Sequence, residues 1–201
     1  MNRLRLIASV AFAGLALLGA NLATATTVQK FSRQDLAKKS ESIVIGKVED
    51  VSSRQDAANK EIYTYITLSV SESVKGAKGE KLVTIRQLGG TVGNIISAVP
   101  GMPTFKPGEQ VVVFLSPKDQ AGYPWVMGLQ QGKYSVLTGD NGVKFVRNEL
   151  DGLKLLSVDG ATNEATVSSD LPLAAFLDGI KTDLNLDGKV KVDTSNPTPI
   201  K

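Results

Sequence analysis

The clearest alternation of apolar and polar residues in the chain runs from Ile62 to Val74. A period of two over this length predicts a strand with one face buried. One side of it carries Ile62, Thr64, Ile66, Leu68 and Val70, and the other carries Tyr63, Tyr65, Thr67 and Ser69.

Other runs predict further strands. Val111–Leu115 is apolar at every position, which indicates a strand buried on both faces. Ser42–Ser53 opens with three apolar residues and then alternates, and its Gly46 indicates a bulge or bend. Many strands at close spacing with glycine turns favour an all-β barrel or sandwich. Shorter strands are expected at Lys81–Leu88, Tyr123–Leu129, Gly132–Thr138 and Val143–Asn148.

Two short helices are expected to flank the strands. In Phe31–Ser42, Ser32 can cap the first amides and Asp35 stands three positions later, as in a capping box. In Ser168–Leu184, Ser169 or Asp170 would be the cap and Pro172 would lie in the first turn. The apolar face of this second helix would comprise Leu173, Phe176, Leu177 and Ile180.

The N-terminal residues predict export. A basic start, an apolar run that ends at Ala20 and the small residues before Ala25 are typical of a signal peptide cleaved after Ala25. The run is too short for a comfortable membrane span. Of 201 residues, 176 would then remain, and loss of Arg3 and Arg5 would leave 21 basic against 20 acidic residues. We expect a secreted or periplasmic protein. Its residues 26–182 would form one domain, and residues 183–201 would form a polar tail.

Composition excludes several kinds of chemistry. The chain has no cysteine and no histidine, so it can form no disulfide, no histidine-dependent nucleophile system and no zinc site of the usual kind. Paired carboxylates, Ser–Lys pairs and hard-metal oxygen sites remain possible. The basic residues are scattered among acids, so we expect no nucleic-acid partner. No pair of carboxylates can be placed at one cleft from the sequence, and we expect no enzyme.

The long loop between the strands Lys81–Leu88 and Glu109–Pro117 is a candidate contact surface. Its glycines lack the following helix that a phosphate site requires, so they indicate backbone freedom at positive φ. Its prolines would stiffen it, and its methionine and phenylalanine either offer apolar contact or fold back onto the core. The residues concerned are Gly89, Gly90, Gly93, Pro100, Gly101, Met102, Pro103 and Phe105.

Trp125 is the only tryptophan. With Gln130, Gln131 and Tyr134 nearby in sequence, it is a candidate for a patch that binds a partner or a glycan. Large aromatic residues are usually well buried, so core packing is the alternative. We keep Trp125 among the candidate partner-binding residues.

The segment Asp183–Thr194 resembles the start of a calcium-binding loop. Asp183, Asn185 and Asp187 are followed by a glycine, and Lys189 would offer its carbonyl. The bidentate acid that usually closes such a loop is replaced by Thr194, so any Ca²⁺ would bind weakly. The alternative is a simple Asn/Asp/Gly turn.

The order of segments resembles that of tissue inhibitors of metalloproteinases and other netrin-like modules. The residues that carry this resemblance are Ser40–Val51, Tyr63–Gly76 and Gly108–Leu115. It implies an OB-type barrel with flanking helices. In that family the amine and carbonyl of an N-terminal cysteine chelate the protease zinc, and Thr26 followed by Thr27 would stand at that place here. The loop Leu88–Glu109 also resembles one from an uncharacterised family of exported bacterial proteins, which implies no activity.

These observations give one main functional hypothesis and two others. We expect an exported binding protein on a small OB-like barrel, which contacts a protein and inhibits or accompanies an extracellular metalloprotease. A calcium-dependent extracellular structural module is the second hypothesis. A carboxylate-based hydrolase is the third, although the sequence indicates no substrate.

Overall fold

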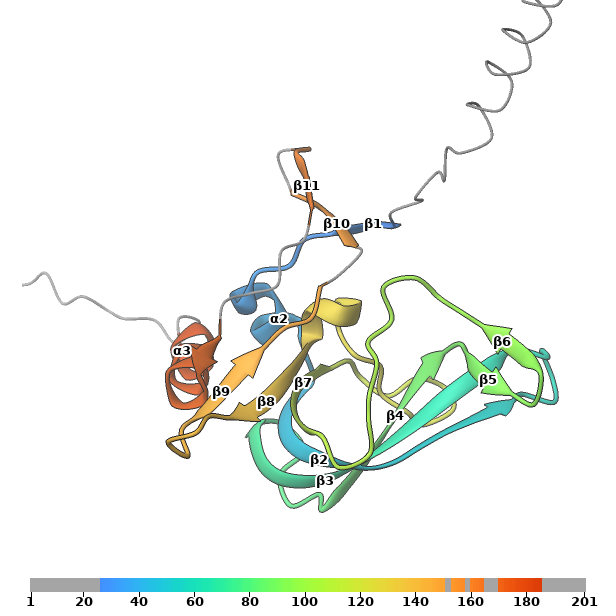
Figure 1. Ribbon diagram of the computed structural model, residues 1–201, viewed down its shortest axis with the longest axis horizontal. Coiled ribbons are helices and arrows are strands. Elements are labelled where there is room, and N and C mark those ends of the chain that lie inside the picture. The colour runs from blue at the N-terminus through green and yellow to red at the C-terminus, as the bar shows by residue number, and fades with distance from the viewer. Residues whose placement is uncertain (1–25, 151–152, 158–159, 165–169, 186–201) are drawn as a thin grey trace, which may run out of the picture.

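The computed structural model describes residues 26–150, 153–157, 160–164 and 170–185 (Figure 1). The expected signal peptide and most of the expected polar tail lie outside these residues. The described part of the chain is mostly β, with a large antiparallel sheet and two α-helices, as the sequence predicts at this coarse level. Within the described part of the chain, no helix has the length and apolar character needed to cross a membrane.

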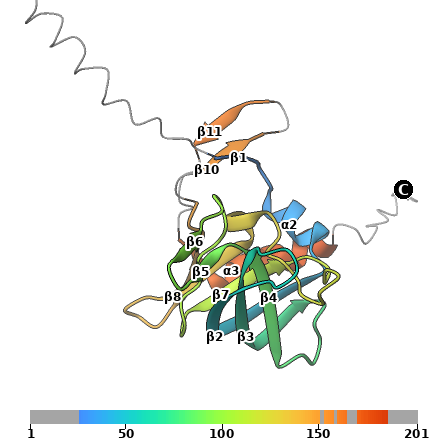
Figure 2. The same ribbon diagram turned by 90° about the vertical axis from the view of Figure 1, so that its right-hand side faces the viewer.

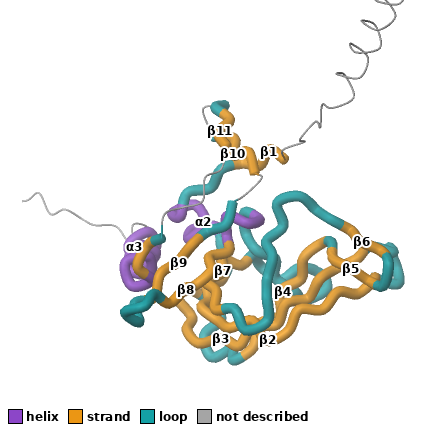
Figure 3. The backbone as a smooth tube through the Cα atoms, in the orientation of Figure 1, coloured by secondary structure: helices purple, strands orange, loops and turns teal. Residues whose placement is uncertain are grey.

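The large sheet has the order β12-β9-β8-β7-β2-β3-β4. The two longest strands, β2 and β3, pair along almost their whole length and curve together across the molecule (Figures 1 and 3). The bounds of the seven strands, in sheet order, are Leu171–Pro172, Lys144–Arg147, Lys133–Thr138, Gln110–Leu115, Ser42–Gln55, Ile62–Lys75 and Leu82–Leu88.

The predicted irregularity at Gly46 is confirmed. The register between β2 and β3 shifts between Ile45 and Gly46, and again between Val48 and Asp50. A Cβ at Gly46 would lie 2.8 Å from the carbonyl oxygen of Ser69. Glycine therefore lets the two backbones approach at the point where the strand bends.

Strand β7 and the first half of β2 are buried on both faces, which confirms the prediction for Val111–Leu115. One face packs against the helices in a core that includes Ile43, Ile45 and Phe114. The opposite face lies inside the curve of the sheet, in a second core that includes Val44 and Ile66. Two separate apolar layers thus hold the same pair of strands in place.

Two helices cover the first core. Helix α2 (Arg33–Lys39) has Ser32 as its N-cap. The predicted capping box is present, because the side chains of Asp35 and Ser32 each accept a hydrogen bond from the other's backbone amide. Helix α3 (Leu173–Asn185) buries the predicted face. Pro172 lies one residue before α3, in β12, and α3 continues past residue 182, which corrects the expected boundary of the tail.

The predicted strand Tyr123–Leu129 is wrong. Only Val126 forms a β-bridge, to Leu115. Gly128 and Leu129 both adopt positive φ, which ends the extended conformation and begins the 3-10 helix η2 (Leu129–Gly132). The segment before this turn still links two strands, because the amide of Arg86 in β4 donates to the carbonyl of Pro124 at 3.0 Å.

Two smaller sheets complete the described structure. Strands β5 (Gly90–Val92) and β6 (Ile95–Ser97) form a hairpin within the long loop. Strands β1 (Thr26–Gln29), β10 (Leu153–Leu156) and β11 (Thr162–Glu164) form a sheet in which β1 runs parallel to β10. Figure 2 shows this second sheet standing apart from the large one.

Candidate functional site

The glycine pair after β4 makes a tight turn across the end of β2 and β3. Gly89 has φ +94°, and its backbone donates to the carbonyl of Ile62 at 2.7 Å and accepts the hydroxyl of Thr64 at 2.7 Å. A Cβ at Gly90 would collide with the hydroxyls of Ser53 and Thr64. Both glycines therefore position the chain that follows them, as their expected backbone freedom suggests.

The chain that follows is an exposed hairpin, which was not predicted from the sequence. Ile95 and Ile96 are 56% and 76% exposed. A Cβ at Gly93, at the hairpin turn, would meet no heavy atom within 4 Å, so the tip is open to solvent. The Gly93–Asn94 pair between short apolar runs is a hairpin signal that could have revealed it.

Of the two alternatives for Phe105, the structure selects the second: the side chain folds back onto the core, which removes it from the candidate partner-binding residues. It is 8% exposed and belongs to the second core. Pro103 is also buried, and its carbonyl accepts the side-chain amide of Gln87 at 2.9 Å. Met102 is half-buried, Pro100 is exposed, and the carbonyl of Gly101 accepts the amide of Gln130. This half of the loop folds back onto the protein.

A buried ion pair lies next to Phe105. The ammonium of Lys133 donates to Glu109 Oε1 at 2.5 Å and to the hydroxyl of Ser135 at 2.9 Å. Ser135 in turn donates to the same oxygen of Glu109 at 2.6 Å. The Lys133 side chain is only 5% exposed. Because Lys133 and Ser135 both donate to the same oxygen of Glu109, this Ser–Lys pair resembles a structural network more than a nucleophile with its base.

Trp125 belongs to a cluster on the outer face of β3 and β4. Its indole N–H donates to Asp119 Oδ2 at 2.8 Å, and its ring meets Tyr63 edge-on with the centroids 6.3 Å apart. Arg86 donates to the same Asp119 oxygen at 2.6 Å and stacks over Tyr63. Gln131 and Tyr134, which were expected near Trp125, lie elsewhere. The side chain of Gln131 accepts a hydrogen bond from the amide of Phe31, and Tyr134 packs against the first core.

Asp119 is the centre of this cluster. Its second oxygen accepts the amides of Ala121 and Tyr123. Burial tends to raise the pKa of Asp119, but the hydrogen bonds from Tyr123, Trp125 and Arg86 and the charge of Arg86 outweigh it and lower the pKa. The carboxylate thereby pins the segment that holds Trp125 across β4. We refer to Arg86, Asp119 and Trp125 as the clamp.

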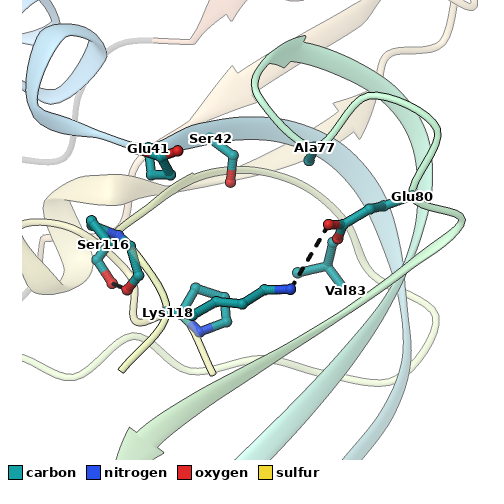
Figure 4. Close-up of a pocket in the computed structure, with 9 residues that line it drawn as sticks. Glu41, Ser42, Ala77, Glu80, Val83, Ser116 and Lys118 are labelled. Atoms are coloured by element: carbon teal, nitrogen blue, oxygen red, sulfur yellow. Dashed lines mark hydrogen bonds and ion pairs between the residues drawn. The ribbon is translucent and has the colours of Figure 1, made fainter. Parts of the chain in front are cut away.

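A pocket of about 460 Å³ opens next to the clamp. Figure 4 shows its lining side chains as a ring around the hollow, with Lys118 and Glu80 facing each other at 3.9 Å. This volume is within the range of ligand sites. The lining combines the start of β2, the β3–β4 turn, β4 and the segment after β7: Glu41, Ser42, Ala77, Glu80, Val83, Ser116, Pro117, Lys118 and Pro124.

The residues at the expected mature N-terminus lie in a strand. Thr26 and Thr27 belong to β1 and pair with Leu153 and Lys154 of β10. Their backbone is therefore part of the small sheet and far in sequence from the hairpin. The structure brings neither of them together with the predicted loop residues through any interaction among the described residues.

The prediction that Asp183 is a calcium ligand is corrected, because its carboxylate pairs with a basic side chain. Asp183 lies within α3 and accepts the guanidinium of Arg33 at 2.7 Å. Asn185 is the last residue of α3, whereas Asp187 and Lys189 lie outside the described residues. Among the residues that the structure describes, no three acidic side chains gather as a metal site would require. Asp183 joins the two helices instead.

We therefore expect Asp183→Asn to lower the free energy of unfolding by about 1 kcal/mol, equally with and without Ca²⁺, because it breaks a partly exposed ion pair. Thermal melts at saturating Ca²⁺ and in chelator would measure this. Asp178→Asn, on the exposed face of α3, is the matched control. A Ca²⁺-dependent rise in melting temperature that Asp183→Asn abolishes would restore the calcium hypothesis.

No protein-family model matches this chain, and a search of curated proteins finds no significant match.

Proposed function

We propose that this chain is an exported, non-enzymatic binding protein that contacts a protein partner through the β5–β6 hairpin. The observation that carries the proposal is the exposure of Ile95 and Ile96, two large apolar residues in succession. Successive residues of a strand point to opposite faces. The hairpin therefore presents apolar surface on both faces of its tip.

This geometry suits a partner with an apolar cleft that encloses the hairpin. Full burial of an isoleucine side chain contributes about 1.5–3 kcal/mol, so two of them would supply a large part of a binding free energy. Gly89 and Gly90 fix the base of the hairpin against β2 and β3. A fixed base lowers the conformational entropy lost on binding.

We further propose that the large sheet is an OB-like, incompletely closed barrel. The pairing of β2 with both β3 and β7 and the link from Arg86 to Pro124 support this. OB-type barrels bind through loops and one face. Because a protease cleft is an enclosing recess, the netrin-like resemblance makes an extracellular metalloprotease the first partner to test.

The test is capture from culture supernatant and periplasm with residues 26–201 as bait, followed by affinity measurement with the purified partner. Ile95→Ser with Ile96→Ser should weaken binding about 30-fold, which corresponds to about 2 kcal/mol. Leu137→Ser with Val143→Ser is the matched control, because these side chains are also exposed but lie at the β8–β9 turn. Equal retention of every captured protein by the hairpin variant would refute the proposal.

A further inference from the structure

Strand β4 is an edge of the large sheet, and its outer side has open backbone groups. Val70 donates to the carbonyl of Lys81, so these two residues form a hydrogen-bonded pair of the antiparallel ladder. Because such pairs alternate, the backbone groups of Leu82, Thr84 and Arg86 point away from β3. The bond from Arg86 to Pro124 agrees with this direction.

The open part of this edge is the stretch before Arg86. Pro124 occupies the position opposite Arg86. Beyond that point, no strand among the described residues pairs with the outer side of β4. Leu82 and Thr84 thus present two amides and two carbonyls in the spacing that a further strand would use.

The pocket lies beside this open stretch. Val83 of β4 lines one side of it, and Ser116, Pro117 and Lys118 line another. Figure 4 shows Ser116 and Lys118 across the hollow from Val83 and Glu80. The sheet is therefore parted between β4 and the segment after β7, and the gap is wide enough for a ligand. We call this gap the seam.

Charge on the seam favours a basic ligand. Two carboxylates, Glu41 and Glu80, and one ammonium, Lys118, line it. The Lys118–Glu80 pair is long, at 3.9 Å, and both side chains are exposed, so it is weak and can open. Lys75 lies nearby in sequence, but its ammonium donates to three carbonyls at the end of α2 and does not line the seam.

We propose that the seam binds an extended peptide segment of a partner protein, which adds to β4 as a strand and places a lysine or arginine between Glu41 and Glu80. The backbone of Leu82 and Thr84 supplies the main-chain hydrogen bonds. The apolar side chains of Ala77, Val83 and Pro124 contact the peptide's neighbouring aliphatic side chain. This site is separate from the hairpin, so its failure would leave the proposed function untouched.

Two peptides test the proposal by amide NMR on residues 26–201. The probes are acetyl-Val-Lys-Val-Lys-Val-amide and the same peptide with Glu in place of Lys. We expect the lysine peptide to shift the amides of Leu82 and Thr84 and to slow their hydrogen exchange, and the glutamate peptide to bind at least fivefold more weakly. Both amides should exchange fast before any peptide is added.

Two variants separate the backbone contribution from the charge contribution. Thr84→Pro removes an outward amide and leaves the backbone ladder to β3 in place, although it also removes the hydroxyl contact between Thr84 and Thr67. It should weaken binding of the lysine peptide about tenfold. The double variant Glu41→Gln with Glu80→Gln should weaken binding of the lysine peptide about fivefold and remove its preference over the glutamate peptide. The control is Glu72→Gln, an exposed position on β3, which should leave the binding of both peptides unchanged. If Thr84→Pro does not fold, the glutamine variant decides the question.

Three results would overturn the proposal. In the first, neither amide responds to the lysine peptide. In the second, both peptides bind equally well, which would remove the basic specificity. In the third, the two amides are protected before any peptide is added, which would show that another part of this chain already fills the seam.

Discussion

Replacing Glu109 with Gln will lower the free energy of unfolding by about 3 kcal/mol, as measured by urea denaturation. Lys133 is almost fully buried, and Glu109 is the one carboxylate that its ammonium contacts among the described residues. Removing the negative charge leaves a buried ammonium without compensation, which typically costs 3–5 kcal/mol. We take the low end of this range because Glu109 is partly exposed.

A double variant distinguishes charge burial from lost packing. Lys133→Met in the Glu109→Gln background removes the buried charge and keeps an aliphatic chain next to Phe105, so it should recover at least half of the lost stability. If the two single losses simply add, the ion pair is not what stabilises this region. A loss below about 0.5 kcal/mol for Glu109→Gln alone would contradict the prediction directly.

Asp119→Asn is expected to lower the free energy of unfolding by about 2–3 kcal/mol and to release the segment that holds Trp125. Asp119 accepts four hydrogen bonds, from Arg86, Trp125, Ala121 and Tyr123. In asparagine, an NH2 group replaces one carboxylate oxygen, and this donor would face one pair of the four donors. Arg86, whose side chain is only 14% exposed, would also lose its charge partner. Because Trp125 is the only tryptophan, its fluorescence reports on the clamp directly.

The same variant has a defined pH dependence. The folded state lowers the pKa of Asp119, so the stability that this carboxylate contributes is fully present above its unfolded pKa, about 3.9. That stability is lost as the pH falls through the folded pKa. The difference in stability between the native protein and Asp119→Asn should therefore be constant from pH 5 to 7 and shrink below about pH 4. A difference that stays constant down to pH 3 would contradict the prediction.

A second substitution, at Arg86, separates the two roles of Asp119 in the clamp. Arg86→Met in the Asp119→Asn background should recover part of the stability, because the unpaired guanidinium is removed. The tryptophan emission should remain changed in this double variant, since the hydrogen bond from its indole to the Asp119 carboxylate is still absent. Recovery of both stability and emission would mean that the unpaired guanidinium of Arg86, and not the lost indole hydrogen bond, displaces Trp125 in Asp119→Asn.

The sequence by itself determined the features that depend on near neighbours. The alternation of Ile62–Val74, the apolar run Val111–Leu115 and the capping box of Ser32 and Asp35 each involve residues a few positions apart, and each is present as predicted. The bend at Gly46 is a local backbone property as well. These patterns were sufficient for the β-rich class and for six of the seven strands of the large sheet, but not for β12 or for the strands of the two smaller sheets.

The positions of the ion pairs were decided only by the tertiary structure. Asp119 lies 33 residues from Arg86, Glu109 lies 24 residues from Lys133, and Asp183 lies 150 residues from Arg33. No local pattern specifies such pairs, because each partner is chosen by the path of the strands that carry it. For this reason Asp183 resembled a calcium ligand in the sequence, and the clamp could not be predicted at all.

The candidate sites, too, were predicted from the sequence only in part. Short-range signals marked the long loop as a contact surface but could not decide which half of it faces solvent. The structure buries Phe105 in the second core and leaves Ile95 and Ile96 exposed, because the glycine pair turns the hairpin outward. The seam arises where the backbone edge of β4 diverges from the segment after β7. Such a gap between distant segments is a property of the assembled sheet.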